Sequence, residues 1–476
     1  MNISQKIVKS LKWSFLGKIV IAFFRLFVTA LLARLLTPED YGLFAIISVI
    51  LNFLLMMRDF GFGAFILRSE TVNYKLYHSV NTLNLLIGFL LTFIIFIFSP
   101  ILGSLYNNSI LTPLVQVLSI CIIIQSVGQV SNVEVRKKLN FKLVSIIENI
   151  SFLGGSALAI TMAVLDYGVW SLVFSQIFTT LISTLLFVIK SKYKLKFKFE
   201  IVELKKAFNF SINVSIDKIV NFIRINFDKL ISAKLLNIEV TGMYNMSQSL
   251  VNIPIKFISH TFKDVMLPSF SYLMSDERKL RQYYLSIIQI VGILVFPVLL
   301  VFAIDSKEII SIILGDQWKD ISSVLSILAI IGIIQSVLTI SGTIFISFNC
   351  TNFPLRINSL FLPLYIIGFI VGSYFYGIQG LAISYLAVYI LNCIPIAIKT
   401  MELMDIKFIS ILKIFKILVI PLLIILTMKL IWINKSGFII NSKIDFLIFI
   451  ILSSVFYLIS IFFQRKNILF DLHPHE

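Results

Sequence analysis

Residues 17–52 read GKIVIAFFRLFVTALLARLLTPEDYGLFAIISVILN, and a related stretch follows 200 positions later, at residues 217–252. Ten of the thirty-six aligned positions are identical, and most of them fall in Lys18-Ile19-Val20 and in the pattern Ala33-x-Leu35-Leu36-x-x-Glu39-x-x-Gly42. Self-similarity at a fixed offset is the signature of a duplicated structural unit. Each copy holds a long apolar segment with embedded charges, a short polar turn and the start of a second apolar segment. The sequence therefore predicts two related halves.

The composition is that of a polytopic membrane protein. Of the 476 residues, 58% are hydrophobic and only 14% are charged, and the mean hydropathy is +0.97. Soluble chains have an apolar share nearer one half. A net charge of +17 would suggest a nucleic-acid partner in a soluble chain, but here the positions of the charges indicate membrane topology. We therefore expect no nucleic-acid partner.

No sequence motif indicates catalysis or a metal. The three cysteines lie in apolar runs without metal-ligand or redox spacing. The chain has no Walker A pattern, HExxH motif or nucleophile elbow. We expect no catalytic residue, no metal and no cofactor.

Fourteen apolar stretches are long enough to cross a bilayer, because a helix needs about 20 residues to span the hydrocarbon core. With the N-terminus inside, only four of the 41 Lys and Arg residues fall in outer loops. This matches the enrichment of basic residues in cytoplasmic connections. We predict an all-α protein with fourteen transmembrane helices and both termini in the cytoplasm. The spans lie near residues 11–36, 41–58, 78–101, 111–133, 143–165, 168–189, 208–236, 243–267, 284–304, 321–346, 357–375, 379–398, 414–433 and 444–463.

Two further matched motifs extend the repeat. Gln125-Ser126-Val127 corresponds to Gln335-Ser336-Val337, and Tyr167-Gly168 corresponds to Tyr376-Gly377. Six helices separate the copies, so the two lobes share one orientation and are related by a pseudo-two-fold axis along the membrane normal. The predicted domains are an N-terminal lobe (helices one to six), a basic cytoplasmic linker, a C-terminal lobe (helices seven to twelve), and the last two helices with the tail. They cover residues 1–189, 190–206, 207–398 and 399–476.

The linker is rich in lysine, so it is either a solvated segment attracted to anionic headgroups or a docking site. At the first outer turn, Thr37 is suited to cap a helix and Pro38 to occupy its first position.

Charged residues lie inside several predicted helices, where each costs roughly 2.5–3.5 kcal/mol unless it meets a cavity or a partner. Lys18 and Arg25 share one face of the first helix, and Glu148 lies in the fifth. In the seventh helix, spacings of three and four residues align Asn213, Asp217, Asn221, Arg224 and Asp228 in one polar stripe, flanked by Lys218 and Lys229.

Two interpretations of these charges stay open. They form internal ion pairs that fix packing, or they line a central vestibule with a net positive sign once Lys256 of the eighth helix is included. A cationic vestibule favours an anionic substrate, and phosphate is the group that arginine forks bind best.

The chain resembles the polysaccharide transporter family, the Wzx-type flippases of lipid-linked oligosaccharides, within the superfamily that also contains the multidrug and toxin extruders. Four segments carry the resemblance over about the first 400 residues: Ala33 to Gly42, Arg136-x-x-Leu139-x-Phe141-Lys142, Gly242-x-Tyr244 with Pro254, and Gly315-x-x-Trp318. It implies two six-helix lobes plus two helices, working by alternating access in the bacterial cytoplasmic membrane. The implied cargo is an undecaprenyl-pyrophosphate-linked repeat unit for O-antigen, capsule or exopolysaccharide, and the implied partners are membrane lipids and polymerase and chain-length machinery.

This resemblance gives the vestibule a role. We expect Lys18, Arg25, Arg224 and Lys229 to contact the pyrophosphate, and Asp217, Asp228 and Glu148 to couple transport to an ion gradient. The alternatives are a drug or cation antiporter of the same architecture, a membrane polymerase or glycosyltransferase, and a scaffold without transport activity.

Overall fold

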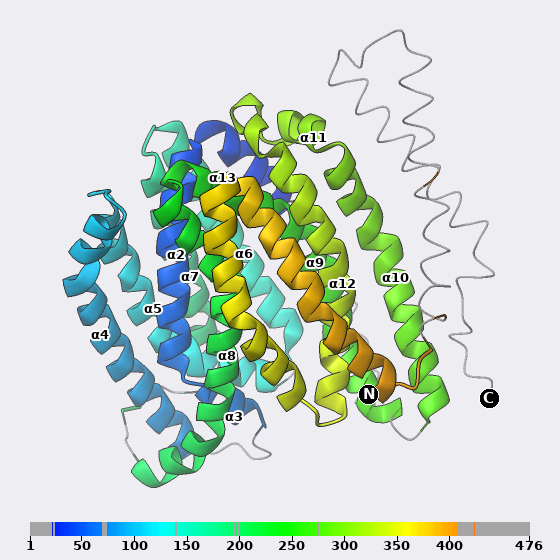
Figure 1. Ribbon diagram of the computed structural model, residues 1–476. Helices are drawn as coiled ribbons and strands as arrows, with labels where there is room; N and C mark the ends of the chain where they lie inside the picture. The colour runs from blue at the N-terminus through cyan, green and yellow to red at the C-terminus, as the bar shows by residue number, and fades with distance from the viewer. Residues whose placement is uncertain are drawn as a thin grey trace. The chain divides into compact units, whose positions relative to one another are not determined.

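The computed structural model describes residues 21, 24–68, 74–138, 140–191, 193, 196–197, 200–273, 276–407, 409 and 423. In this part of the chain every regular element is a helix (Figure 1). A helix over residues 24–35 precedes α2. The others are α2 (Pro38–Asp59), α3 (Phe62–Arg68), α4 (Tyr74–Leu105), α5 (Leu111–Lys137), α6 (Phe141–Val164), α7 (Val169–Lys190), α8 (Ile201–Leu235), α9 (Ile238–Leu273), α10 (Glu277–Ile304), α11 (Ser306–Ile313), the 3-10 helix η1 (Asp316–Ile321), α12 (Ser322–Ser347) and α13 (Asn352–Leu403).

The helices agree with the predicted spans wherever the structure describes them. Eight of the described helices are long and apolar enough to cross a membrane, so the chain is a multi-pass membrane protein. Residues 11–20 of the first predicted span and almost all of the last two spans lie outside the described residues. The count of fourteen, the lobe symmetry and the domain boundaries therefore stay predictions.

Helix α13 contains the junction between the two spans predicted near 357–375 and 379–398. Its backbone leaves the helical region at Tyr376 and Gly377, and Gly377 has φ 59°, a conformation that glycine adopts without strain. The two halves approach closely beside this turn, since a Cβ on Gly380 would lie 2.1 Å from the carbonyl oxygen of Gly372. Only glycine fits there.

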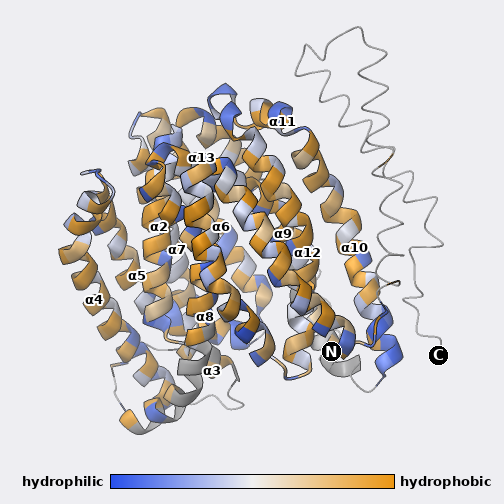
Figure 2. Cartoon of the chain, viewed as in Figure 1, coloured by the Kyte–Doolittle hydropathy of each residue, from blue (hydrophilic) through white to orange (hydrophobic). Residues whose placement is uncertain are grey.

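Contacts divide the chain into two compact units, Met1–Met246 with Asn358–Tyr385, and Ser247–Ile357 with Leu386–Glu476. In the first unit, α4 packs along α5, α5 along α7, and α6 along α7, while α2 contacts both α5 and α8 (Figure 1). The buried side chains of this unit include Ile46, Leu114 and Val173. Hydrophobic residues cover most of α4 (Figure 2), and many of its phenylalanines are exposed, as expected for a surface that faces lipid.

In the second unit, α10 packs along α12. The Tyr284 hydroxyl and the Ser341 hydroxyl form a buried hydrogen bond of 2.9 Å between these helices. The segment between the spans predicted near 284–304 and 321–346 is folded, with α11 and η1 placing Trp318 in a fully buried position.

The two copies of the repeated turn contact each other. Thr37 caps α2 in a capping box with Asp40, as predicted, and Asn237 accepts a hydrogen bond from the Val240 amide at the same place in the second copy. A Cβ on Gly42 would lie 1.8 Å from the carbonyl oxygen of Ile238, and a Cβ on Gly242 would lie 1.8 Å from the carbonyl oxygen of Pro38. These contacts are reciprocal. Gly42 and Gly242 lie 200 positions apart, as do Pro38 and Ile238, and 200 is the offset of the repeat. The repeated pattern thus marks a place where two helix starts cross with backbone in contact.

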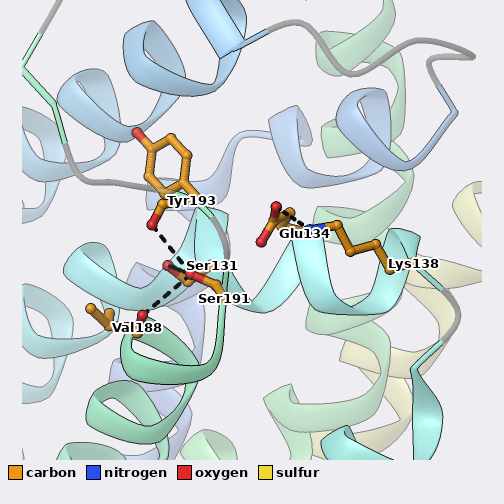
Figure 3. Close-up of polar contacts among 6 residues, drawn as sticks. All are labelled: Ser131, Glu134, Lys138, Val188, Ser191 and Tyr193. Atoms are coloured by element: carbon orange, nitrogen blue, oxygen red, sulfur yellow. Dashed lines mark hydrogen bonds and ion pairs between the residues drawn. The ribbon is translucent and has the colours of Figure 1, made fainter.

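The linker is attached to the first unit at several points. Ser191 donates hydrogen bonds to the Ser131 hydroxyl at 3.1 Å and to the Tyr193 carbonyl at 3.4 Å (Figure 3). The Tyr193 side chain is 3% exposed, and its hydroxyl lies 3.0 Å from Nδ1 of His78. Burial raises the pKa of Tyr193 to about 12, so the phenol stays protonated. Farther along, Glu200 donates its amide to Ser79, and α8 begins at Ile201, earlier than the predicted 208.

Tyr193→Ala is expected to destabilise the first unit by about 3 kcal/mol, because it removes a buried ring and leaves a cavity. Tyr193→Phe keeps the ring and loses only the hydroxyl contacts, so its cost should be about 1 kcal/mol. The thermal unfolding midpoint of the purified protein measures both. Equal midpoints for wild type and Tyr193→Ala would contradict the attachment.

Candidate functional site

A polar face of α8 runs through the first unit, and each of its charged side chains meets a group from a different helix. Lys218, Asn221, Arg224 and Asp228 follow one another at spacings of three and four residues, which places them along one side of the helix. The side of α8 near Lys218 packs on α2, where Phe222 contacts Phe53 with ring centroids 5.6 Å apart. The stripe predicted from the sequence is therefore an interhelical feature.

Asp228 is the most buried member, with 1% of its surface exposed. The Tyr244 hydroxyl of α9 donates a hydrogen bond of 2.8 Å to Oδ2 of Asp228, and the Lys229 backbone amide donates one of 2.8 Å to Oδ1. A carboxylate buried at this depth is costly unless donors surround it. Tyr244 occupies the Gly-x-aromatic position of the second repeat, so the repeat itself supplies this donor.

Arg224 lies in the middle of the stripe and is half-buried. One of its terminal nitrogens donates to the Asn221 side chain at 2.8 Å, and its guanidinium carbon lies 6.0 Å from the centroid of the Tyr365 ring on α13. Asn221 itself is exposed. A guanidinium held at an aromatic face keeps its positive charge, and its fork of N–H groups matches the oxygens of a phosphate.

A buried charged network at the other end of the stripe was missed by the sequence analysis. Asp59 accepts from Lys218 at 3.0 Å, from Gln129 at 3.0 Å and from the Gly63 amide at 3.3 Å. Gln129 in turn accepts from Arg58, a guanidinium that is only 2% exposed. Lys218 therefore contacts the carboxylate directly, whereas Arg58 is linked to it through Gln129. The sequence signal that could have found it is the adjacent Arg58-Asp59 pair at the end of an apolar helix.

Two other predicted site residues, Arg25 and Glu148, make their contacts away from α8. The Arg25 side chain is exposed, and its guanidinium lies 5.0 Å from the centroid of the Phe152 ring on α6. Glu148 is exposed and accepts a hydrogen bond of 2.6 Å from Arg136. Lys18 lies outside the described residues, and the side chain of Asp217 also lies outside them. Among the described residues, the Arg25 guanidinium contacts an aromatic ring of α6, whereas that of Arg224 contacts one of α13.

The interior of the unit also holds two amides without hydrogen-bond partners among the described protein atoms. Asn81 and Asn84 of α4 are 1% and 0% exposed, and neither their oxygen nor their nitrogen atoms are bonded. A buried polar group left unpaired costs roughly 1–3 kcal/mol. We expect Asn84→Leu, a change of similar volume, to raise the thermal unfolding midpoint by the equivalent of about 1 kcal/mol.

The matched control is Asn140→Leu. Asn140 caps α6 by accepting from the Leu143 amide, so its loss should lower the midpoint by about 1 kcal/mol. If Asn84→Leu lowers the midpoint as Asn140→Leu does, then the buried amide of Asn84 is satisfied in solution.

The described residues contain no group of three or more His, Cys, Asp or Glu side chains that could hold a metal ion. What the first unit offers is a line of cations, Arg58, Lys218, Arg224 and Lys229, with Asp59 and Asp228 as the carboxylates beside them. These cations can bind an anion, or they can change the carboxylate with which they pair when the helices move.

Comparison with known proteins identifies the family of this chain. A family model described as a polysaccharide biosynthesis protein matches residues 31–323, more than half of the chain. The chain belongs to this polysaccharide biosynthesis family. The resemblance noted in the sequence is thereby confirmed.

Two curated relatives match this chain at low identity. The lipopolysaccharide biosynthesis protein WzxC of Escherichia coli K12 is 25% identical over 400 residues, which cover 83% of this chain and 80% of WzxC. The teichuronic acid biosynthesis protein TuaB of Bacillus subtilis 168 is 24% identical over 349 residues, covering 73% of this chain and 72% of TuaB.

Solved structures show the fold of this family member. The lipid II flippase MurJ in an inward closed conformation superposes with a TM-score of 0.74 at 18% identity, covering 97% of this chain and 99% of MurJ. A multidrug resistance transporter of the MATE family in an inward-facing conformation gives a TM-score of 0.62 at 14% identity, covering 82% and 99%. The family member thus has the fold of membrane transporters and flippases.

Proposed function

We propose that this protein is a flippase that moves undecaprenyl-pyrophosphate-linked oligosaccharide repeat units across the bacterial cytoplasmic membrane by alternating access. The observation that carries the proposal is the cationic stripe of α8 within a membrane-spanning unit, centred on the half-buried guanidinium of Arg224. A pyrophosphate is the most anionic part of a lipid-linked sugar, and arginine is the side chain best suited to bind it. The names of WzxC, TuaB and the MurJ flippase support the same substrate class.

The residue roles follow the charge of each group. Lys18, Arg25, Arg224 and Lys229 are the proposed pyrophosphate contacts. Asp217, Asp228 and Glu148 are the proposed ion-coupling carboxylates. Asp228 is favoured among them because it is buried, and burial changes the relative stability of the charged and neutral forms of a carboxyl group. The termini are proposed to be cytoplasmic, as the distribution of Lys and Arg indicates.

Arg224→Ala is expected to lower the flipping rate about tenfold to a hundredfold, since charge-assisted hydrogen bonds contribute roughly 1.5–3 kcal/mol. The readout is the amount of surface polysaccharide together with accumulation of the lipid-linked oligosaccharide on the cytoplasmic side. Arg356→Ala removes an exposed arginine at the start of α13 and serves as the control, with polymer at the wild-type level.

Membrane abundance of each variant must equal that of wild type for the comparison to hold. Unchanged polymer in Arg224→Ala would refute the role of Arg224. Deletion of the gene without any change in the lipid-linked pool would refute the function itself. A cation antiporter of the same fold would instead confer resistance to cationic dyes on expression, although a cationic site repels such cargo.

A further inference from the structure

A second site lies beyond the Asp228 end of the cationic stripe, where α8 ends and α9 begins. It is a cavity of about 410 Å³, formed where the turn after α4, the turn between α8 and α9, and the first turn of α2 meet. Cavities of this size fall in the range that small ligands occupy, about 300–1,000 Å³. The distribution of basic residues places these three turns on the outer face of the membrane. The polar residues that line the cavity are Glu39, Tyr106, Asn107, Lys234, Asn237 and Glu239.

The cavity is held together by defined contacts. Nζ of Lys234 donates a hydrogen bond of 2.6 Å to the carbonyl oxygen of Leu105, which joins the end of α8 to the end of α4. Asn237 caps α9 through the Val240 amide. Asn107 has φ 51°, a left-handed conformation that asparagine tolerates, and the turn it forms borders the cavity. These contacts fix the walls without using either glutamate.

The two glutamates are the repeat partners Glu39 and Glu239, so the duplication brings one carboxylate from each copy to a single cavity. Both are exposed. The helix caps at these positions are made by Thr37 with Asp40 and by Asn237, which leaves the carboxylates of Glu39 and Glu239 outside the capping bonds. Burial raises the pKa of Tyr106, so its hydroxyl is a protonated donor.

The lining combines acceptors, donors and a flat aromatic side chain. Carboxylates and amide oxygens accept hydrogen bonds, while the ammonium, the amide nitrogens and the phenol donate them. A ligand with many adjacent hydroxyl groups satisfies such a set, and an aromatic ring suits the apolar face of a sugar. Two carboxylates against one ammonium leave a net negative sign, which disfavours phosphate. The pyrophosphate and the sugar therefore require binding sites of different charge.

We propose that this outer pocket binds the saccharide part of the cargo, as an exit site on the outer face. The proposal rests on the proposed flippase function, because it assigns the pocket to the sugar of the same lipid-linked substrate. Transport then uses two sites of opposite sign: the cationic stripe for the pyrophosphate and the outer pocket for the hydroxyl-rich sugar.

The test is binding of a free oligosaccharide to the full-length protein in nanodiscs. The probe is the repeat-unit oligosaccharide obtained by partial acid hydrolysis of the host's surface polysaccharide, detected by saturation-transfer NMR. We expect the double variant E39Q/E239Q to bind it at least about tenfold more weakly than wild type, since two charged acceptors are lost. Asp320→Asn, which neutralises an exposed carboxylate of another outer segment, should bind like wild type.

Arg224→Ala should also bind the free oligosaccharide like wild type, because the probe carries no pyrophosphate. This variant separates the two proposals. An unchanged lipid-linked pool after gene deletion would refute the flippase function, whereas the binding assay tests the outer pocket alone. As a second measurement, Asn107→Cys should react more slowly with a maleimide when the oligosaccharide is present. Absence of binding by wild type, or equal binding by wild type and E39Q/E239Q, would overturn the proposal.

Discussion

Gly42→Ala and Gly242→Ala are each expected to lower the stability of the protein by about 3 kcal/mol, at the upper end of the range for overpacking. The added Cβ would lie 1.8 Å from a backbone carbonyl oxygen in either case, far inside van der Waals contact. Neither opposing atom can rotate away, because both belong to helix starts fixed by capping bonds. The helices α2 and α9 must separate, and the apolar packing of Leu43 and Ile46 beside the crossing is loosened.

The matched control is Gly342→Ala in α12. A Cβ at Gly342 meets nothing within 4 Å, and alanine has a higher helix propensity than glycine by up to about 1 kcal/mol. The thermal unfolding midpoint should therefore fall for Gly42→Ala and Gly242→Ala and stay level or rise for Gly342→Ala. Parallel behaviour of all three variants would show that the close crossing is absent in the membrane.

The reciprocity of the crossing predicts strong coupling between its two glycines. Once one methyl group has pushed the helices apart, the second meets less resistance, so the double variant should cost clearly less than the sum of the single variants. Residues in direct contact commonly show interaction energies of roughly 0.5–3 kcal/mol in such a cycle. Additive costs would mean that Gly42 and Gly242 report on two separate contacts.

The sequence predicted the local structure of this crossing and the stripe, because both depend on short-range patterns. The cap at Thr37, the helical spacing of Lys218 to Asp228 and the break at Tyr376-Gly377 can all be read from neighbouring residues. The matching of Gly42 with Gly242 showed that these positions were related. It did not show that they touch.

The partners of each charge could not be predicted, because they come from helices far away in the sequence. Asp59 lies 159 residues before Lys218, and nothing in a helical period selects that pair. Glu148 illustrates the same limit: its place in an apolar stretch suggested a membrane carboxylate, yet it is exposed and bonded to Arg136 across the turn between α5 and α6. Its proposed role in ion coupling stays untested.

Asp59→Leu is expected to be the most destabilising single change in the described part of the stripe, with a loss of about 3–5 kcal/mol. The substitution removes the carboxylate that contacts Lys218 and Gln129. The buried guanidinium of Arg58 and the ammonium of Lys218 then lose the negative charge near them. Lys218 can reach solvent because its side chain is 39% exposed, whereas Arg58 cannot. Most of the cost therefore comes from Arg58.

This assignment predicts a rescue. Arg58→Met combined with Asp59→Leu removes the buried cation together with the carboxylate linked to it through Gln129, and replacing paired buried charges by apolar residues is often neutral or stabilising. The double variant should regain most of the lost thermal unfolding midpoint, while Glu148→Gln, which breaks an exposed ion pair, should change stability by only about 0–1 kcal/mol. A double variant as unstable as Asp59→Leu would show that Asp59 acts through its bond to the Gly63 amide and the start of α3 instead, since that contact is lost in both variants. Because the rescued protein would lack the Arg58 charge but keep Arg224, its surface polysaccharide level would also separate the structural cations of the stripe from those that meet the cargo.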